Sequence, residues 1–599
     1  MDLHFTEDEP TAEEREAIDG CLDAQAGFST AADRRQYLLP ALHAIQARAG
    51  WISPGALNHA CRRLEVPPAE AFGVADFYAL FQTRPHPPVT VHVCDDIACR
   101  FRGGEDLCAA LGRSLGPEGT SPDGRSAWHR SPCLGLCERA PAALAIAAGD
   151  APREQALAPA TESDVQAFLD GRTVPEPDLA RSVPQLGQPG LTLLRRVGRV
   201  DPLSLDDYRA AGGFLALRRA IEMGPERVVR EVIDSKLVGR GGAAFPTGQK
   251  WQGVRSTALP RYLICNADES EPGTFKDRVL MENDPFSLIE AMTIAGFATG
   301  CEKGYLYIRG EYPLATERLE NAIRRSRERG YLGEDILGDG VRFDIELRRG
   351  AGAYICGEET ALMNSLEGRR GEPRNKPPFP TQVGLFGQPT VINNVETMVN
   401  VLPIVIGGGK AYAATGTERS TGPKLFCLSG HVQRPGVYEA PFGVTLREVL
   451  EMAGGIGGSG RLQAILLGGA AGSFVTPDQL DIPLTFEGTR AAGTSLGSAV
   501  VMPFDDTVDL RQTLRRIAQF FRDESCGQCV PCRVGTVRQE ELLHRLATDR
   551  PFGSKEEEGA LLKELGQVMR DASICGLGQT ASSAIESALT KFPILQERP

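Results

Sequence analysis

The arrangement of the cysteines limits the possible structures of this chain more than any other feature of its sequence. Of fifteen cysteines, three lie within seven residues in Cys526-Gly-Gln-Cys529-Val-Pro-Cys532, and Cys575 follows in SICGLG. Three closely spaced thiolates and one distant thiolate match the four corners of a [4Fe–4S] cluster. Zinc is the alternative, but it more often takes its ligands as two separated pairs. The spacing therefore favours the iron–sulfur cluster.

A second set of cysteines lies nearer the N-terminus. It consists of two pairs, Cys94-x4-Cys99 and Cys133-x3-Cys137, and the first pair begins at the end of VTVHVC, an expected strand. One pair per iron fits a [2Fe–2S] cluster, but two cysteine pairs also suit tetrahedral zinc. Spacing alone leaves both possibilities open. The other seven cysteines are scattered and are interpreted as small buried hydrophobic residues.

Composition and charge exclude several functional classes. The chain carries 65 Lys and Arg against 78 Asp and Glu, a net charge of −13, whereas nucleic-acid binders present a basic surface. No apolar run reaches 18 residues, so we expect no membrane-spanning helix. The acidic N-terminus lacks the apolar core of a secretory signal. We therefore expect a cytoplasmic protein, in which clustered cysteines bind metal more often than they form disulfides.

Secondary-structure patterns predict an α/β multidomain chain. Apolar residues at 38, 42, 45 and 49 fall on one helical face, VTVHVC and AALAIA are typical of strands, and four prolines between 175 and 189 indicate a linker. A Pro-Gly turn at 435–436 predicts a hairpin, and residues 510, 514, 517 and 521 predict a helix. The expected segments are helices at 1–84, a small α/β domain at 85–172, a linker at 173–204, a larger α/β domain at 205–423, a β-rich module at 424–503 and a helical domain at 504–599.

A glycine-rich loop within the larger domain is of the type that binds phosphate. It reads Gly239-Arg-Gly-Gly-Ala-Ala-Phe245-Pro-Thr-Gly-Gln-Lys250. Glycines let backbone N–H groups approach an anion, and Arg240 or Lys250 adds positive charge. The preceding VVREVIDSKL predicts a helix, whereas the dinucleotide fingerprint requires a strand there. A standard Rossmann unit is therefore not expected, and a simple glycine turn remains the alternative.

Two acidic segments also suggest a ligand site. The stretch from Asn266 to Gly273 contains Asp268, Glu269 and Glu271, and GAGAYICGEE ends in two further carboxylates. Most charge runs are solvated turns, but the surrounding glycines favour close approach of a ligand. Carboxylates beside a nucleotide commonly accept hydrogen bonds from ribose hydroxyls. KPPFP (376–380) adds a cation and an aromatic ring, and two amides follow at 393–394.

These motifs together resemble a known family. GAGAYICGEETALMNS and ESCGQCVPCRVG resemble the signature motifs of the NADH-binding flavoprotein subunit of respiratory complex I, as do GRGGAAFPTGQKW, CNADESEPGTFKDR, NKPPFP and INNVET. The resemblance covers about 205–599. The N-terminal part, with LLPALHAIQARAGWI and the four-cysteine set, is similar to the thioredoxin-like [2Fe–2S] subunit of the same module. The fusion of the two resembles the diaphorase subunits of soluble NAD-dependent formate dehydrogenases and NAD-reducing hydrogenases.

The resemblance implies FMN, NAD, a [2Fe–2S] cluster and a [4Fe–4S] cluster as cofactors, held in thioredoxin-like, FMN-binding, β-grasp-like and C-terminal helical domains. It assigns the FMN phosphate and ribityl chain to Gly239, Arg240, Gly241, Gly242 and Lys250. It assigns the flavin ring to Asn266, Asp268, Tyr354, Gly357, Asn393 and Asn394, with Glu269 also among the cofactor-binding residues. It assigns the NAD(H) side to Phe245, Glu271, Glu358, Glu359, Lys376 and Phe379. It assigns the clusters to Cys94, Cys99, Cys133, Cys137, Cys526, Cys529, Cys532 and Cys575.

One departure from the family concerns the adenine pocket: where some relatives have an aromatic residue shortly after KW, this chain has Gln252-Gly253. Direct hydride transfer between nicotinamide and flavin needs no general base, so we expect no catalytic side chain. Glu271 and Glu359 are expected to favour NAD over NADP, because a carboxylate repels the additional phosphate of NADP.

The expected function is that of a diaphorase subunit, which passes electrons between NAD(H), FMN and iron–sulfur clusters. MRDASICGLGQTAS around Cys575 and YRAAGGF at 208–214 resemble the formate-dehydrogenase type more than complex I. The expected partner is thus a large molybdenum- or tungsten-pterin subunit with iron–sulfur domains. A hydrogenase or complex I remains the alternative partner, and a non-enzymatic iron–sulfur scaffold is the alternative class.

Overall fold

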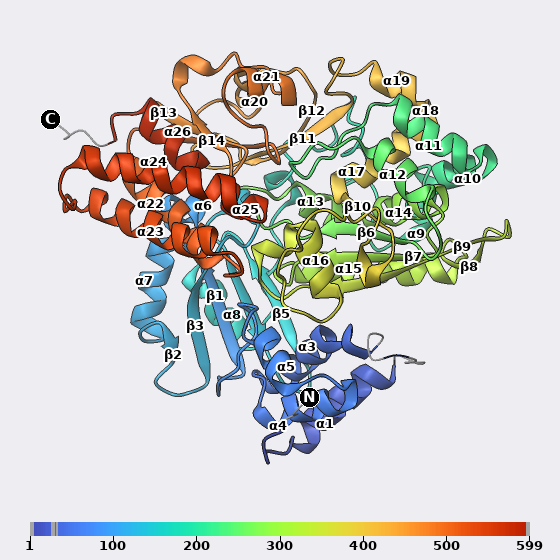
Figure 1. The fold of residues 1–599 in the computed structure, drawn as a ribbon, viewed down its shortest axis with the longest axis horizontal. Helices are drawn as coiled ribbons and strands as arrows, with labels where there is room; N and C mark the ends of the chain where they lie inside the picture. The colour runs from blue at the N-terminus through green and yellow to red at the C-terminus, as the bar shows by residue number, and fades with distance from the viewer. Residues whose placement is uncertain (1–4, 25–29, 31–33, 595–599) are drawn as a thin grey trace.

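The computed structural model describes residues 5–24, 30 and 34–594. In Figure 1 the colour bar separates the parts: blue N-terminal helices and strands below, a green and yellow centre, an orange module above and red C-terminal helices at one side. The described residues form three five-stranded sheets. This confirms the expected α/β multidomain architecture.

Helices begin the chain and pack on the central domain. In the helix Leu38–Ala49, Leu38, Leu42 and Ile45 are buried, as the spacing predicted. The next helix starts where Ser53 accepts a hydrogen bond from the backbone N–H of Ala56 (3.0 Å). The backbone N–H of Ala79 donates to the carbonyl of Gly352, which ties the segment to a glycine turn of the central domain. The helices are α1 Ala12–Asp23, α3 Leu38–Ala49, α4 Pro54–Leu64 and α5 Pro68–Ala75.

The first sheet has the strand order β2-β3-β1-β4-β5. The predicted strand VTVHVC is the central strand β1, which runs parallel to β3 and antiparallel to β4. The cysteine pairs follow β1 and β3, so they lie at the same end of the sheet. The elements are β1 Val89–Cys94, α6 Ile97–Cys99, η1 Arg100–Gly104, α7 Glu105–Ser114, β2 Gly119–Thr120, β3 Ser126–Ser131, η2 Cys137–Arg139, β4 Ala143–Ala147, β5 Arg153–Leu157 and α8 Glu162–Leu169.

The proline-rich segment after α8 is packed against other domains although it has little regular structure. One short helix, η3 Leu179–Arg181, interrupts it. The carboxylate of Glu439 accepts hydrogen bonds from the backbone N–H groups of Thr192, Leu193 and Leu194 at 2.6–2.9 Å. Arg196 forms a buried ion pair with Asp284. The segment therefore fixes the central domain and the β-rich module to each other.

The central sheet has the order β10-β6-β7-β9-β8, in which the first four strands are parallel and β8 is antiparallel. The loops that follow β6, β7, β9 and β10 thus leave one edge of the sheet, where ligands bind in such sheets. These strands are β6 Tyr262–Ala267, β7 Lys303–Ile308, β8 Gly333–Ile336, β9 Val341–Arg349 and β10 Thr390–Asn394.

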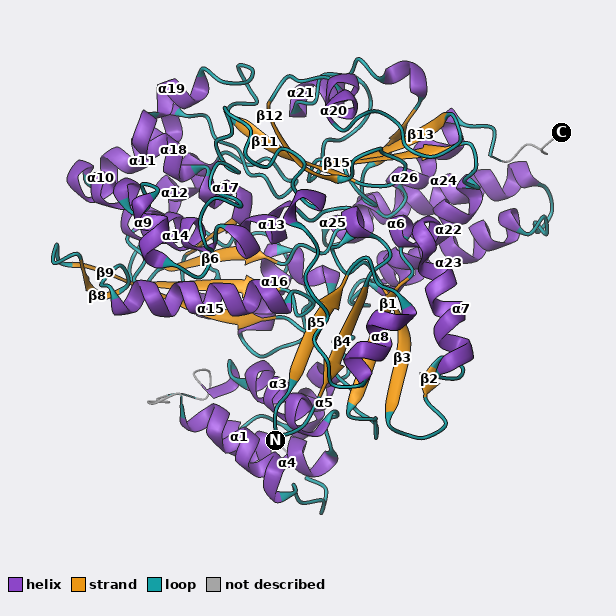
Figure 2. Cartoon of the chain, turned by 180° about the vertical axis from the view of Figure 1, so that it is seen from behind, coloured by secondary structure: helices purple, strands orange, loops and turns teal. Residues whose placement is uncertain are grey.

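Helices cover the central sheet, as Figure 2 shows from behind. The segment before the glycine-rich loop is helix α11, which confirms that no strand precedes this loop. The helices are α9 Leu205–Ala210, α10 Leu215–Met223, α11 Pro225–Asp234, α12 Thr247–Arg255, α13 Lys276–Asn283, α14 Pro285–Thr299, α15 Pro313–Glu328, η4 Tyr354–Gly357, α16 Glu359–Leu366, η5 Leu385–Gly387, α17 Val395–Val399, α18 Val401–Gly407 and α19 Gly409–Ala413.

The third sheet, of order β12-β11-β15-β13-β14, forms the β-rich module. The predicted hairpin joins β11 and β12, but residues 429–435 connect the strands and Gly436 already belongs to β12. Thr445 and Glu448 form the predicted capping box. The elements are β11 Pro423–Leu428, β12 Gly436–Pro441, α20 Leu446–Met452, β13 Leu462–Leu467, β14 Ser473–Val475, η6 Pro477–Gln479, α21 Phe486–Ala491 and β15 Val500–Asp505.

The C-terminal part is a helical bundle. The predicted apolar face of its first helix, Leu510, Leu514, Ile517 and Phe521, is buried. In the described part of the chain, no helix combines the length and apolar composition needed to cross a membrane. The helices are α22 Leu510–Asp523, α23 Val530–Ala547, α24 Lys555–Ala572, α25 Gly576–Thr580 and α26 Ser583–Lys591.

Candidate functional site

A cavity of about 420 Å³ opens at the carboxyl edge of the central sheet. Three domains supply its walls, because loops of the central domain meet two loops of the β-rich module and the first turns of α25. The lining residues are Gly241, Gly242, Ala243, Asn266, Asp268, Glu269, Ser270, Glu271, Thr274, Lys276, Asp277, Tyr354, Ile355, Gly357, Glu358, Asn394, Gly468, Ala471, Ser495, Gly497, Ser498, Gly576, Leu577 and Thr580.

The glycine-rich loop presents its backbone to this cavity. A side chain at Gly241 would come within 3.2 Å of the Cβ atom of Asn394, and Gly242 has φ +113°, which favours glycine. The loop leads into α12, whose N-terminal N–H groups add partial positive charge. The two glycines thus form a close-fitting cradle that a flat or anionic group can approach.

Arg240 points away from the cavity. Its side chain is completely buried, and its Nη2 donates to the carbonyl of Thr421 (2.6 Å) and the hydroxyl of Tyr412 (3.1 Å). The guanidinium also lies 4.5 Å from the ring centre of Phe442. This side chain, which the resemblance placed on the FMN phosphate, therefore joins the glycine loop to the β-rich module.

Aromatic and charged side chains gather outside the cavity lining. Phe245 and Phe379 are both about half exposed, and the Nζ of Lys250 lies 5.7 Å from the ring centre of Phe245. Lys376 forms ion pairs with Glu359 (2.7 Å) and Glu358 (2.9 Å). Burial lowers the pKa of Lys250, whereas the charge of Glu359 opposes this effect. Of the side chains expected on the NAD(H) side, Glu358 thus lines the cavity, Lys376 joins it to Glu359, and Phe245 lies against Lys250, whereas Phe379 is exposed.

The carboxylates of the acidic segment after β6 have different roles. Asp268 faces the cavity, and burial raises its pKa to about 8. Glu269 instead accepts hydrogen bonds from the backbone N–H groups of Asp277 (2.8 Å) and Arg278 (2.9 Å), so it caps the first turn of α13. Both residues lie in one short loop, yet only Asp268 keeps its carboxyl available to a ligand.

Glu271 connects three parts of the site. One carboxylate oxygen accepts from the hydroxyl of Tyr354 (2.5 Å) and the other from the backbone N–H of Ala471 (2.8 Å). Burial raises the pKa of Glu271 to about 7, although both hydrogen bonds oppose the shift. This carboxylate therefore holds the β-rich module against the central domain, and neither of its oxygens is free.

The predicted amides also behave differently from one another. Asn266 donates to the carbonyl of Gly357 (2.8 Å), which joins the loops after β6 and β9. Asn393 is buried, and its side-chain oxygen accepts a hydrogen bond from the indole Nε1 of Trp251 (2.9 Å), so this amide contributes to the packing of the core. Asn394 lines the cavity, donates to Asp277 (2.6 Å) and caps α17.

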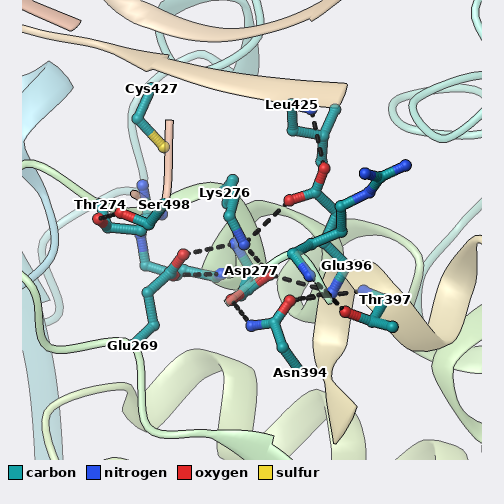
Figure 3. A network of polar contacts seen from close by, with 12 residues as sticks. Glu269, Thr274, Lys276, Asp277, Asn394, Glu396, Thr397, Leu425, Cys427 and Ser498 are labelled. Atoms are coloured by element: carbon teal, nitrogen blue, oxygen red, sulfur yellow. Dashed lines mark hydrogen bonds and ion pairs between the residues drawn. The ribbon is translucent and has the colours of Figure 1, made fainter. Parts of the chain in front are cut away.

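A buried ionic network behind the cavity was not predicted from the sequence (Figure 3). Lys276 pairs with Asp277 (2.8 Å) and Glu396 (3.1 Å), and Glu396 also pairs with Lys424 (2.6 Å) of the β-rich module. Burial alone would lower the pKa of Lys276, but the charges of Asp277 and Glu396 outweigh it and raise this pKa. Lys276 and Asp277 stand in FKDR, directly after the acidic segment, which is the signal that could have identified them.

We expect Glu396→Ala to destabilise the central domain by about 3–5 kcal/mol, because it leaves two buried ammonium groups without their shared partner. The urea midpoint of unfolding, followed by circular dichroism, measures the effect. Glu418→Ala is the matched control, since that glutamate is exposed. Equal midpoints for the two variants would contradict a stabilising role of the network.

The four N-terminal cysteines converge in the structure. All four are buried, and the Sγ atoms of Cys133 and Cys137 are 3.3 Å apart. The central domain reaches this set directly, because Arg309 donates to the carbonyl of Cys133 (2.7 Å) and Arg278 to that of Gly135 (3.0 Å). The first sheet is therefore fixed with its cysteine end against the cavity-bearing domain.

The four C-terminal cysteines lie near one another: burial raises the pKa of Cys532, and the charges of Cys529, Cys575 and Cys526 raise it further. Cys526 and Cys529 lie between α22 and α23, Cys532 is in the first turn of α23, and Cys575 precedes α25. Backbone N–H groups of Leu577 and Gly578 donate to the thiol of Cys575, which favours its ionised form, although burial raises its pKa to about 11. Since Gly576 and Leu577 line the cavity, this cysteine set stands directly behind the cavity wall.

Comparison with protein families agrees with this arrangement. Residues 24–159 match the thioredoxin-like [2Fe–2S] ferredoxin family, 232–403 the Nuo51 FMN-binding domain, 425–470 the SLBB domain, and 512–598 the NADH-ubiquinone oxidoreductase-F iron–sulfur binding region. These matches confirm FMN and both iron–sulfur clusters, and they favour iron–sulfur over zinc at both cysteine sets.

Individual proteins are similar over long stretches. The chain is 46% identical over 404 residues to the second F-type subunit of NADH-quinone oxidoreductase from Rhizobium meliloti, covering 67% of this chain and 95% of the relative. It is 43% identical over 400 residues to the NADP-reducing hydrogenase subunit HndC of Solidesulfovibrio fructosivorans, covering 66% and 81%. A chain of an NAD+-reducing [NiFe]-hydrogenase in the H2-reduced state superposes with a TM-score of 0.80 at 34% identity, covering 94% of this chain and 92% of that one.

Proposed function

The chain belongs to the family of F-type subunits of NADH-quinone oxidoreductase, the NADH-binding flavoprotein subunits, and on that premise we propose that it is the NAD+-reducing half of a formate dehydrogenase. As a member it transfers electrons among NADH, FMN and iron–sulfur clusters. The formate partner is the part that we propose. The chain itself carries the nucleotide and flavin half of such a reaction, so the second substrate is bound by another subunit.

The observation that carries the diaphorase reaction is the cavity shared by three domains. It lies between the glycine loop, the acidic loop after β6 and the helix that follows Cys575. A two-electron donor in this cavity is thus separated from the C-terminal cysteine set by one turn of backbone. Such a position suits a cofactor that accepts a hydride and passes on single electrons.

The residues present fit FMN. A Cβ at Gly241 would press on Asn394 at 3.2 Å, and the φ of Gly242 favours glycine, so this loop keeps its backbone open to a ligand. Asp268 and Asn394 offer polar atoms to it. When bound, FMN accepts the hydride of NADH directly. In this proposal the chain positions the reactants: the exposed rings of Phe245 and Phe379 would stack on adenine or nicotinamide, and Glu359 would accept hydrogen bonds from ribose hydroxyls.

Two sequence segments support formate dehydrogenase as the assembly. One is MRDASICGLGQTAS, which supplies Cys575 and the cavity wall at α25. The other is YRAAGGF, in which Tyr208 and Phe214 are buried: Phe214 has φ +61° and its ring stacks on Tyr331 at 3.7 Å. Both resemble the formate-dehydrogenase type. A cytoplasmic location is part of the proposal, because thiolate-bound clusters suit a reducing compartment.

A hydrogenase is the second candidate partner. The solved NAD+-reducing [NiFe]-hydrogenase chain matches 94% of this chain, and thus includes the fused N-terminal domain. Complex I relatives such as that of Rhizobium meliloti match 67% of it. The fusion therefore favours a compact formate- or hydrogen-oxidising assembly over complex I.

Purification of the chain from its native source with the subunits that bind it tests the proposal. We expect formate-dependent NAD+ reduction and molybdenum or tungsten in the assembly. Hydrogen-dependent NAD+ reduction with nickel, and no formate activity, would instead establish the second candidate. An assembly without either activity would refute both.

We expect Glu359→Gln to increase the use of NADPH relative to NADH by roughly tenfold to a hundredfold, since it removes a like charge worth on the order of 1–3 kcal/mol against the 2′-phosphate. It also frees Lys376 from one of its two ion pairs, so that this cation can meet the phosphate. The measurement is kcat/KM for both nucleotides with ferricyanide as acceptor.

Glu271→Gln is the matched control. Because both oxygens of Glu271 are engaged by Tyr354 and Ala471, the structure changes the expectation for this residue, and this variant should lower the use of both nucleotides together. A changed NADPH preference in Glu271→Gln, or none in Glu359→Gln, would overturn the assignment of discrimination to Glu359.

A further inference from the structure

Ser270 stands between the central cavity and a second, smaller cavity. The second cavity, of about 270 Å³, lies where the first sheet, the central domain and α22 meet. Ser270 and Tyr354 line both cavities. The second cavity reaches the protein surface at Ala79 and Arg130, which are exposed. Ser270 and Tyr354 therefore stand in the wall that the two cavities share.

The second cavity is built to hold water. Three buried polar atoms in its lining, Nε of Arg309, Oε2 of Glu311 and Nε2 of His129, have no hydrogen-bond partner among the described residues. Buried polar atoms without a protein partner are normally satisfied by ordered water. The volume is sufficient for several water molecules at about 30 Å³ each. Water in this cavity would reach Ser270, which is part of its lining.

From Ser270 the hydrogen-bonded path continues into the central cavity. Its hydroxyl donates to Oδ2 of Asp268 (2.9 Å), and the backbone N–H of Asp268 is held by Asn266 (3.1 Å). The pKa of Asp268 is raised to about 8, mainly because the carboxyl is buried. The positive charge of Arg309 partly opposes this shift, and the negative charge of Glu311 adds to it. The groups that face this carboxyl are Ser270, Arg309, Glu311, Glu524, Tyr78, Tyr307 and Cys356.

The reaction requires a proton at this place. Reduction consumes one proton, since NADH + FMN + H+ gives NAD+ + FMNH2, and oxidation by the clusters returns FMN, two electrons and two protons. A nucleotide bound beside the flavin would exclude water from the mouth of the cavity. Protons therefore have to enter and leave from the other side while the nucleotide is bound.

We propose that Asp268 exchanges this proton with the flavin, and that Ser270 and the second cavity connect Asp268 with solvent. The inference rests on the proposed placement of FMN in the central cavity. In the direction of NADH oxidation, the protonated carboxyl of Asp268 would supply a proton to bound FMN and regain one from Ser270, whose hydroxyl would be resupplied by water. When the clusters take the two electrons, the same groups carry the two protons outward.

The test compares Asp268→Asn, Ser270→Ala and Ser270→Thr in the full chain by stopped-flow reduction of bound flavin with NADH between pH 6 and 9. In the unaltered chain the rate falls as the pH rises through about 8, because the proton donor becomes ionised. Loss of a positioned acid typically costs 10²–10⁴-fold, so we expect Asp268→Asn to be at least about 100-fold slower, without this inflection. We expect flavin reduction to be slower in Ser270→Ala than in the unaltered chain, and to return toward the unaltered rate in Ser270→Thr, which retains the hydroxyl.

FMN content separates this proposal from the flavin placement on which it rests. Gly241→Val fills the cradle beside Asn394, so retention of FMN by this variant would refute the placement itself. If Asp268→Asn loses FMN, the comparison of Ser270→Ala with Ser270→Thr tests the proton route instead. Wild-type rates and pH profiles in Ser270→Ala, with FMN bound, would overturn the proton route, and so would equal defects in Ser270→Ala and Ser270→Thr.

Discussion

Replacement of Cys529 by alanine is expected to abolish electron transfer from the flavin to any partner protein while NADH still reduces the flavin. Cys529 lies between Cys526 and Cys532 and caps α23, so its loss removes a central ligand of the cubane. The flavin cradle at Gly241 and Gly242 is on a separate loop. Iron content, the low-temperature EPR spectrum and partner-dependent activity measure the loss, and FMN content and NADH–ferricyanide activity measure what is retained.

The matched control is Cys427→Ala, because Cys427 is buried in the β-rich module and belongs to neither set. That variant is expected to keep both clusters. Unchanged iron content and EPR signals in Cys529→Ala would contradict the assignment of the [4Fe–4S] cluster to Cys526, Cys529, Cys532 and Cys575.

Replacement of Cys133 by alanine is expected to eliminate the [2Fe–2S] spectrum and to leave NADH–ferricyanide activity largely intact, and Cys94→Ser is expected to do the same. Cys133 makes the 3.3 Å sulfur contact with Cys137 at the end of the first sheet. Its carbonyl, which binds Arg309, survives the substitution, so the contact between the domains is kept. Visible absorption and EPR after partial reduction measure the cluster.

The control for this second prediction is Cys108→Ala, a buried cysteine of α7 in the same domain. It is expected to keep the [2Fe–2S] spectrum. A [2Fe–2S] signal that persists in Cys133→Ala would remove Cys133 from the ligand set. Loss of NADH–ferricyanide activity together with the cluster would show that the cluster and the flavin site are not separate modules.

The pH dependence of stability adds a check on the site. Burial raises the pKa of Asp268 to about 8 and that of Glu271 to about 7, above their values in the unfolded chain. Both groups therefore bind protons more tightly when folded, so their contribution favours the folded state at low pH and is lost as pH rises through about 7–8. Asp268→Asn removes one of the two contributions, and thermal unfolding at pH 6 and 9 should show a smaller difference in that variant.

The local features of the site were predictable because they depend on neighbouring residues. A C-x2-C-x2-C run places three thiols on one turn whatever surrounds it, and the glycine spacing of 239–242 leaves backbone accessible to a ligand. The same holds for the strand VTVHVC, the capping box at Thr445 and the helix before the glycine loop. In each case the signal and the structure span only a few residues.

The direction of individual polar side chains was not predictable. Arg240, Glu269 and Asn393 stand within the right motifs, yet they bind Tyr412, the N-terminus of α13 and Trp251. Buried donors and acceptors need partners, and the partners of these three come from distant parts of the chain or from a helix end. Their neighbours Gly241, Asp268 and Asn394 face the cavity instead.

The sequence by itself thus determined the cysteine spacings, the type of glycine loop and the residues that stand close together along the chain, because these are local properties, and its motifs indicated the cofactors through their resemblance to a family. Only the tertiary structure decided that the β-rich module and α25 complete the cavity, that Glu271 and the Lys276–Glu396–Lys424 network fasten them there, and that a second cavity meets the first at Ser270. Those arrangements depend on packing between segments hundreds of residues apart, and no spacing along the chain encodes them.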